Sequence, residues 1–331
     1  MATLTDRMFG RKPREAAGPV TSYPTTMINK VMNRGEWGIL LALALIWGAA
    51  FFCIKVAVTH VEPLTYVWLR LSIAAAALWA LLRWRGERLR LPVGIWGAIL
   101  VLAVLNNMIP FVLFGWGQQR IASGLASILN ATTPIWGVIA AHLWTRDERI
   151  TPTKILGVLI GFAGVATMIG PDLLFGGDSL LPQLACLVAA FCYAVAGVWA
   201  RRFKALGVSP LKVAAAQLAV GAFAMAPLAL AIDQPWLDAW PPLEAWAAIV
   251  ALALVATAFG YVLYFRLIDS AGATNALLVT LLVPPTAILL GALFLKEQLT
   301  IGQFGGLAFI ALGLALIDGR LLAKFRRKAT A

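Results

Sequence analysis

Long runs of apolar residues recur along nearly the whole chain, and short polar segments separate them. Most runs contain about 20 residues, which is the length that an α-helix needs to cross the hydrocarbon core of a bilayer. The pattern predicts ten membrane-spanning helices, over residues 37–58, 63–83, 93–116, 122–144, 153–170, 180–200, 210–232, 244–267, 273–295 and 301–319. The connections between them are short. We therefore expect an all-α polytopic membrane protein that forms a compact bundle without a large soluble domain.

Polar segments flank the predicted helices at both ends of the chain. Residues 1–35 are basic, and no apolar run precedes Trp37, so we predict a disordered cytoplasmic tail and no cleavable signal peptide. Residues 320–331 predict a basic cytoplasmic C-terminus. Between these segments, residues 36–171 and 180–319 are predicted to form two halves of five helices each.

Lys and Arg are distributed unequally over the two sides of the predicted bundle. With the N-terminus inside, the cytoplasmic segments and adjacent span ends hold 23 of the 27 Lys and Arg residues. The segments on the other side hold only Arg120 and Lys296. Because basic residues concentrate on the cytoplasmic side of membrane proteins, the sequence predicts that both termini are cytoplasmic.

The composition supports the same class and excludes others. Only 13% of the residues are charged, against roughly 25% in a soluble domain, and the mean hydropathy is +0.85. The net charge of +12 lies in short clusters between apolar runs, so it does not indicate a nucleic-acid partner. Cys53, Cys186 and Cys192 lie inside apolar runs and are predicted to be free thiols. Neither CxxC nor HExxH occurs, so we expect no metal site and no cofactor.

The two halves of the chain resemble each other. The run WGAILVLAVLNNMIPFVLF at Trp96 aligns with WAAIVALALVATAFGYVLY at Trp246, at an offset of 150 residues. The same offset places Pro134 on Pro284. After one residue drops out, GVLIGFAGVATMIG from Gly157 aligns with GLAFIALGLALIDG. Predicted spans 3–5 therefore correspond to spans 8–10.

Spans 1–2 correspond more weakly to spans 6–7, with Arg70 and Gln217 each seven residues into a span that begins with proline. Each half contains five spans, and because five is odd the second half must cross the membrane in the opposite direction. The sequence thus predicts two inverted five-helix repeats, an architecture common among secondary transporters.

Helix-breaking residues occupy equivalent places in the two halves. Pro110 corresponds to Gly260, and Pro134 corresponds to Pro284. Interrupted spans at matching positions indicate a central binding site or a hinge, because the freed carbonyl groups can face a water-lined cavity. The competing interpretation is that each proline only kinks a helix and neighbouring helices satisfy its backbone.

Several segments carry a family resemblance. They are LALALIWGAAFFCIKVAV in span 1, PLTYVWLRLSIAA in span 2, acidic residues at the 4–5 and 9–10 turns (Asp147, Glu148 and Glu297), and the Gly-rich spans 5 and 10. Together with the duplication, they resemble the drug/metabolite transporter superfamily, and within it the EamA-type branch, over residues 37–319. More narrowly, the chain is similar to the bacterial exporters of aromatic amino acids and methionine of YddG type.

The resemblance implies a secondary transporter in the bacterial inner membrane that works by alternating access. Its implied substrates are small neutral metabolites, above all aromatic and other apolar amino acids, including methionine and threonine. The alternative is a carrier of the same superfamily for a different small metabolite or a drug. Either would have a small-molecule substrate, membrane lipid as its surroundings, and a monomeric or weakly dimeric state.

No Asp or Glu lies well inside a predicted span, so the carboxylates that usually relay protons in transporters are missing. The ammonium group of an amino acid would have to be held by carbonyls, amide oxygens or aromatic faces. The sequence leaves open whether a proton or the substrate gradient drives transport. No Walker motif occurs, so ATP is not expected to drive it directly.

Polar and aromatic residues near the middle of the spans are the candidates for substrate binding: Trp47, Asn106, Asn107, Thr133, Tyr193, Tyr261 and Thr280. The candidates for a gate or hinge are Lys55, Arg70, Pro110, Pro134, Gln217, Gly260 and Pro284. We expect Lys55 to pair with Glu62 in an outer gate. For each candidate the structural alternative stays open: interhelical hydrogen bonding for the amides, snorkelling for the cations and core packing for the aromatics.

Two other function classes are disfavoured. A membrane enzyme needs a polar constellation of His, Asp or Glu at membrane depth, and the sequence offers none, so we expect no enzyme. A channel would show neither saturation nor counterflow. The motif Gly157-x-x-x-Gly161 predicts a close helix contact, within the chain or across a weak dimer.

Overall fold

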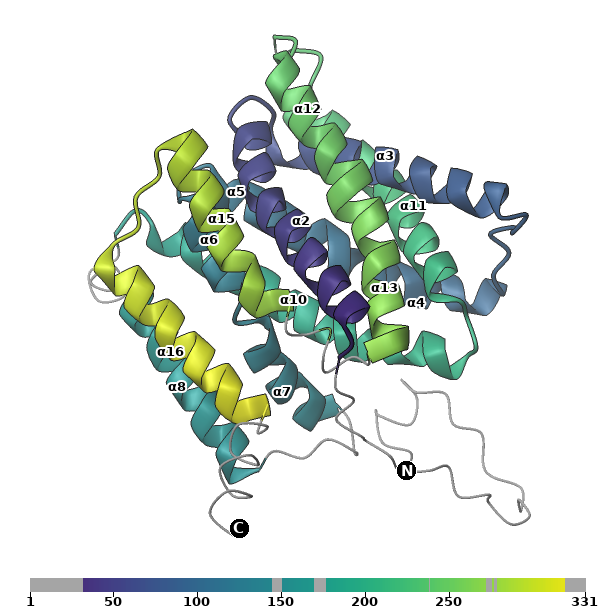
Figure 1. The fold of residues 1–331 in the computed structure, drawn as a ribbon. Coiled ribbons are helices and arrows are strands. Elements are labelled where there is room, and N and C mark those ends of the chain that lie inside the picture. Colours follow the sequence, from purple (N-terminus) through teal and green to yellow (C-terminus); the bar gives the residue numbers. More distant parts are fainter. Residues whose placement is uncertain are drawn as a thin grey trace, which may run out of the picture.

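The structure is a computed structural model that describes residues 32–144, 151–169, 177–237, 239–271, 276 and 279–318 (Figure 1). Over these residues every regular element is a helix. Six predicted spans form single helices: α2 (Arg34–Val58), α3 (Pro63–Trp84), α8 (Pro152–Ile169), α10 (Leu180–Ala205), α15 (Val279–Leu295) and α16 (Ile301–Asp318). Most of the predicted N-terminal tail, the predicted C-terminal segment, and Asp147 and Glu148 lie outside the described residues.

The other four spans are divided. Span 3 comprises η1 (Val93–Ile95), α4 (Trp96–Ala103), the π-helical η2 (Val104–Met108) and α5 (Ile109–Gln118). Span 4 comprises α6 (Ser123–Asn130) and α7 (Thr133–Trp144). Span 7 comprises α11 (Pro210–Leu228) and the π-helical η3 (Ala229–Asp233). Span 8 comprises α12 (Leu243–Ala251), the π-helical η4 (Leu252–Phe259) and α13 (Gly260–Ala271).

These elements confirm the predicted class of a ten-helix membrane protein. Eight of the described spans are long and apolar enough to cross a bilayer, and shorter apolar helices cover residues 282–295 and 301–317. Apart from span 9, whose N-terminal part lies outside the described residues, each span begins within three residues of its predicted position. The agreement follows from the bilayer itself, because its thickness sets the length of every apolar run.

Local sequence signals fix where several helices begin. Asn33 caps α2: its side chain accepts a hydrogen bond from the Glu36 backbone N–H at 2.9 Å, and the Glu36 carboxylate accepts one from the Asn33 N–H at 2.8 Å. Pro63 and Pro210 stand in the first turns of α3 and α11, where the missing N–H costs nothing. Gly86 follows α3 with φ of +72°, a conformation that favours glycine.

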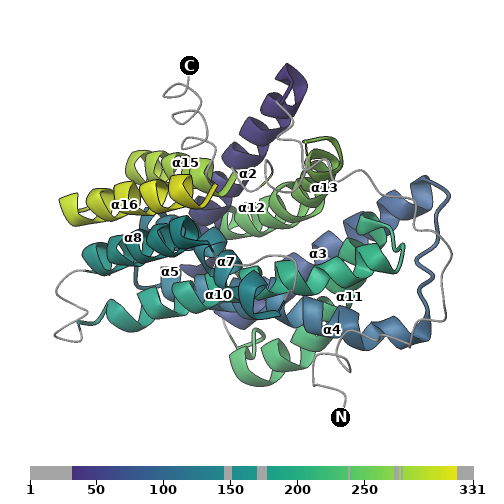
Figure 2. The same ribbon diagram turned by 90° about the horizontal axis from the view of Figure 1, so that it is seen from below.

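Helices α8 and α16 lie side by side at one edge of the bundle (Figures 1 and 2). Glycines permit this approach: a Cβ at Gly157 would lie 2.6 Å from the carbonyl oxygen of Gly313, and a Cβ at Gly164 would lie 2.7 Å from that of Gly306. Gly161 instead faces Ile135 of α7. The glycine face singled out in the sequence therefore makes a contact within the chain.

The contacts between helices form pairs that correspond when the halves are exchanged. Helix α3 packs on α11, which joins spans 2 and 7. Helix α2 of span 1 packs on α15 of span 9, and the corresponding contact joins α10 of span 6 to α6 and α7 of span 4. Helix α10 of span 6 packs on α5 of span 3, and the corresponding contact joins α2 of span 1 to α12 and α13 of span 8. The Gly157–Gly313 contact likewise corresponds to the Gly164–Gly306 contact.

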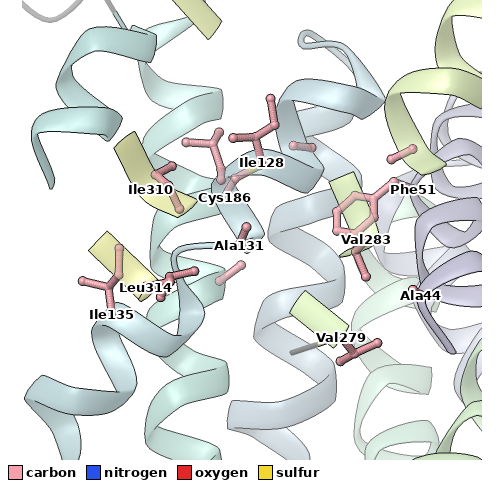
Figure 3. Packing of buried hydrophobic residues seen from close by; sticks show 14 of the residues in the cluster. Ala44, Phe51, Ile128, Ala131, Ile135, Cys186, Val279, Val283, Ile310 and Leu314 are labelled. Atoms are coloured by element: carbon pink, nitrogen blue, oxygen red, sulfur yellow. The ribbon is translucent and has the colours of Figure 1, made fainter. Parts of the chain in front are cut away.

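Apolar side chains from both halves fill the interior. Figure 3 shows Ile135 of α7 with Ile310 and Leu314 of α16, and Ala44 of α2 with Val279 of α15. A second group of buried residues lies among α2, α3, α11, α12 and η4. The polar side chains described next are embedded in these apolar surroundings.

Candidate functional site

Amide and tyrosine side chains meet where spans 3, 7 and 8 come together. The Asn106 Nδ2 donates to the Tyr261 hydroxyl at 3.0 Å and to Gln217 Oε1 at 3.2 Å. The Tyr261 hydroxyl donates to Asn107 Oδ1 at 2.8 Å. Asn107 is fully buried and Gln217 is 2% exposed. The structure thus brings together four of the predicted residues from η2, α11 and α13, which belong to both halves of the chain.

The π-helical segments η2 and η4 lie at corresponding positions in the two halves. At the offset of 150 residues, Val104–Met108 aligns with residues 254–258, inside Leu252–Phe259. The breaks predicted at Pro110 and Gly260 therefore take the form of π segments that end just before these two residues. Single π-helical turns inside α-helices are frequent at functional sites, because they shift the side chains that follow.

Arg70 of α3 reaches the same region. It is 6% exposed, and its Nε donates to the Thr257 hydroxyl at 2.9 Å. Its guanidinium carbon lies 3.7 Å from the centre of the Phe111 ring. The Tyr66 hydroxyl donates to the Phe111 carbonyl at 2.7 Å. Thr257, Phe111 and Tyr66 escaped the sequence analysis, although the offset of 150 places Thr257 on Asn107.

The polar pairs also correspond between the halves. Arg70 of span 2 bonds to Thr257 of span 8, and Gln217 of span 7 bonds to Asn106 of span 3. Arg70 and Gln217 occupy the same place in their spans. Each of these two positions thus bonds to the π segment of the opposite half, one as a cation and the other as a neutral amide. The partners differ by one residue, because the offset of 150 places Thr257 on Asn107 and not on Asn106.

Aromatic side chains surround the amide cluster. The Trp47 Nε1 donates to the Ala256 carbonyl at 3.0 Å, and its ring lies 5.2 Å from the ring of Tyr264. Tyr193 stacks with Phe114 at a centroid distance of 6.1 Å. A Cβ at Gly260 would lie 2.8 Å from the Trp47 Nε1, so glycine makes room for the indole. Trp47 and Tyr193 pack against the same group of buried apolar residues as Tyr261.

The predicted proline breaks differ from each other. Span 4 is interrupted between Asn130 and Thr133, and the Thr133 hydroxyl donates to the Asn130 carbonyl at 2.7 Å, with Pro134 in the first turn of α7. Helix α15 continues through Pro284 and Pro285. Thr280 lies in α15, four residues before Pro284. Proline 284 thus resembles a tolerated membrane-helix proline more than a break.

A second polar group ties the halves together at the end of the bundle where α2 ends. The Lys55 Nζ donates to the carbonyls of Gln118 at 2.5 Å and Ile121 at 3.2 Å. The expected pair with Glu62 is not formed, because Lys55 reaches these carbonyls instead. The Glu297 carboxylate accepts hydrogen bonds from the Ser123 N–H at 2.8 Å and the Ser123 hydroxyl at 2.7 Å.

No group of three His, Cys, Asp or Glu side chains that could hold a metal ion comes together within the described ranges. Cys53 is half-buried, and Cys186 and Cys192 are buried as free thiols in the packed interior.

Comparison with known proteins identifies the family. The sequence profile of the EamA-like transporter family matches residues 36–170 and, a second time, residues 180–318. The chain belongs to the EamA-like transporter family. It is therefore a multi-pass membrane transporter of the drug/metabolite superfamily, and its function is transport and not enzymatic catalysis.

Relatives of this EamA-like chain are transporters as well. The transporter YoaV of Bacillus subtilis, described as uncharacterized, is 25% identical over 83% of this chain and 94% of its own length. The inner membrane transporter YedA of Escherichia coli, also described as uncharacterized, is 28% identical over 85% and 90%. A S-adenosylmethionine/S-adenosylhomocysteine transporter of Chlamydia trachomatis is 28% identical over 83% and 86%.

One solved structure, described only as the crystal structure of a protein, has a TM-score of 0.63 at 20% identity. It covers 88% of this chain and 99% of its own. The match supports the fold. The described helices and the inner-membrane relatives together make this a multi-pass inner membrane protein.

Proposed function

We propose that this transporter exports small neutral metabolites, above all aromatic and other apolar amino acids including methionine and threonine, by alternating access. The observation that carries the proposal is the cluster of Asn106, Asn107, Gln217 and Tyr261, built from both halves and embedded among aromatic side chains. Amide groups offer both donors and acceptors, as a zwitterion needs, and the neighbouring rings suit an apolar side chain.

The correspondence between the halves supports a rocking mechanism. We infer that residues 36–171 and 180–319 are two inverted five-helix repeats, related by an axis that passes between α8 and α16. The paired glycine contacts and the paired π segments support this relation. In such transporters the substrate lies at the repeat interface, and one half moves against the other around it.

We assign the polar group at Lys55 and Glu297 to an outer gate. It joins α2 and α6 of the first half to the end of α15 in the second half. This group lies at the end of the bundle away from the cytoplasm if both termini are cytoplasmic, as the Lys and Arg distribution favours. Its hydrogen bonds would have to break when the outer side opens.

The positions of the acidic side chains bear on what drives transport. The acidic residues of the described structure all lie at, near or beyond helix ends: Glu36, Glu62, Glu87, Asp178, Asp233, Glu244, Asp269, Glu297 and Asp318. Without a carboxylate at membrane depth, proton coupling has no obvious relay. We therefore propose a facilitator or a weakly proton-coupled carrier that is driven by the substrate gradient.

A second candidate substrate comes from the relative in Chlamydia trachomatis. S-adenosylmethionine and S-adenosylhomocysteine each combine an α-amino acid group with an aromatic base. Both would suit a site with amides and aromatic rings. They are the alternative to free apolar amino acids.

The test is counterflow of labelled phenylalanine or methionine into liposomes that contain the purified protein. Saturable counterflow, with competition by unlabelled amino acids, is expected. Asn106→Ala and Tyr193→Phe are expected to lower the affinity, and the exposed Thr153→Ala is the control. Counterflow of S-adenosylmethionine without counterflow of either amino acid would favour the second candidate. Absence of both, with uptake of a different metabolite, would refute the amino-acid assignment.

A further inference from the structure

Arg70 is a buried cation without an anionic partner. It is 6% exposed, its Nε is bonded to a neutral hydroxyl on Thr257, and its Nη1 is buried and has no hydrogen-bond partner. No carboxylate lies within ion-pair distance of it in the described part of the chain. The face of the Phe111 ring offsets part of the charge, but a ring carries no net charge. Burying a charge is costly unless it is paired.

A second buried donor lies in the same region. The Asn107 Nδ2 is buried and has no hydrogen-bond partner, while its Oδ1 accepts from Tyr261. Asn107 and Phe111 are four residues apart in span 3, and Thr257 and Tyr261 are four residues apart in span 8. Residues four apart share a helix face. Phe111 and Thr257, which contact Arg70, therefore share helix faces with Asn107 in span 3 and with its partner Tyr261 in span 8.

Both unsatisfied groups are donors. The Thr257 hydroxyl, Asn107 Oδ1 and Gln217 Oε1 already accept hydrogen bonds within the cluster. The site thus has a surplus of N–H donors and one positive charge. A ligand that completes it must supply acceptors and a negative charge, and a carboxylate supplies both.

We propose that Arg70 and Asn107 form the subsite that binds the carboxylate of the transported substrate. This assignment rests on the proposed function and narrows it: the substrate carries an anionic group, and the guanidinium fixes its orientation between the two halves. The arrangement also explains why no acidic side chain of the described residues pairs with Arg70: a carboxylate of the protein would itself occupy the subsite.

The experiment compares three probes that share a phenyl ring: phenylalanine, 3-phenylpropionate and phenethylamine, of which only the last lacks a carboxylate. Their affinities are measured on purified protein by thermal stabilisation and by inhibition of phenylalanine counterflow. The variants are Arg70→Gln, Arg70→Lys and Asn107→Asp. The control is Arg83→Gln, at an exposed position near the other end of the same helix.

Loss of a charge-assisted hydrogen bond lowers affinity by about tenfold or more. Arg70→Gln is therefore expected to weaken binding of phenylalanine and 3-phenylpropionate about tenfold or more, and binding of phenethylamine less than about threefold. Arg70→Lys should recover part of the loss. Asn107→Asp places a carboxylate one helical turn from the Phe111 ring that Arg70 covers, so it should exclude 3-phenylpropionate and favour phenethylamine over both acids. Because it keeps the buried guanidinium and adds an anion to the same region, this variant should fold even if Arg70→Gln does not.

An equal loss for all three probes would show a purely structural role for Arg70 and overturn the proposal. Unchanged binding in both Arg70→Gln and Asn107→Asp would also overturn it. Replacement of chloride by gluconate distinguishes the other source of negative charge. If it abolishes binding of phenylalanine and phenethylamine alike, chloride occupies the subsite and the substrate carboxylate does not.

The proposed function can fail separately. If the wild-type protein shows no amino-acid counterflow, yet 3-phenylpropionate stabilises it and fails to stabilise Asn107→Asp, the amino-acid assignment is wrong and the anionic subsite stands. If counterflow is robust and the three probes respond alike to every variant, the transport function stands and the subsite is wrong.

Discussion

Adding one methyl group between α8 and α16, by replacing a glycine with alanine, tests the packing at the edge of the bundle. In Gly157→Ala, the new Cβ would lie 2.6 Å from the Gly313 carbonyl oxygen, 2.8 Å from Ile317 Cγ1 and 3.2 Å from the Ile317 N. Two of these atoms belong to the backbone. A change of rotamer cannot relieve the clash, so the two helices must move apart along their contact.

Overpacking of this kind costs about 1–3 kcal/mol. Since each kcal/mol shifts the melting temperature of a chain of this size by about 2 °C, we expect the melting temperature of the detergent-solubilised protein to fall by about 2–6 °C. The measurement is loss of the monodisperse chromatographic peak after heating. Gly161→Ala should cost less, because its Cβ meets the flexible end of Ile135.

Gly137→Ala and Gly197→Ala are the matched controls, because a Cβ at either position meets nothing within 4 Å. They should leave the melting temperature unchanged or raise it, since alanine favours a helix over glycine by up to about 1 kcal/mol. If Gly157→Ala were as stable as these controls, the close approach of α8 and α16 would be wrong.

Two further predictions concern the ends and the centre of the site. Glu297→Gln should make hydrogen exchange of the Ser123 amide at the start of α6 faster, because the amide loses a charged acceptor. Lys55→Met should do the same less directly, because it removes the bonds that hold the Gln118 and Ile121 carbonyls just before Ser123. Equal protection in variant and wild type would argue against a gate here. Trp47→Phe removes the 3.0 Å hydrogen bond to the Ala256 carbonyl in η4 and should destabilise the protein by about 1 kcal/mol, as measured by thermal unfolding, while a variant as stable as the wild type would contradict that bond.

The ten spans could be predicted from the sequence because the bilayer imposes one length on every apolar run. The partners of the mid-span residues could not. The sequence singles out Asn106 and Tyr261 as polar groups at membrane depth, but the bond between them depends on how spans 3 and 8 rotate about their axes. Apolar periodicity says little about rotation in helices that face lipid on one side and apolar side chains on the other.

The π segments were not predictable for a related reason. A π-helical turn differs from an α-helical turn by one inserted residue, and a run of uniformly apolar residues gives no sign of that insertion. The repeat did contain a usable signal for Thr257, since it aligns with Asn107 at the offset of 150 residues. Pro284 shows the opposite error: its position in the repeat suggested a break, but the helix continues through it because neighbouring helices can satisfy a membrane proline.

The polar cluster has residues at equivalent positions in the two halves, but only one half contributes a charged side chain to it. Arg70 and Gln217 occupy equivalent places, and each reaches across to a π segment of the opposite half. The single guanidinium, in contrast, distinguishes the two halves for any ligand that lies between them. A second arginine in place of Gln217 would put two like charges together at low dielectric and raise the cost of burial. Under the proposed carboxylate subsite, one cation opposite one neutral amide would hold an asymmetric substrate in a single orientation.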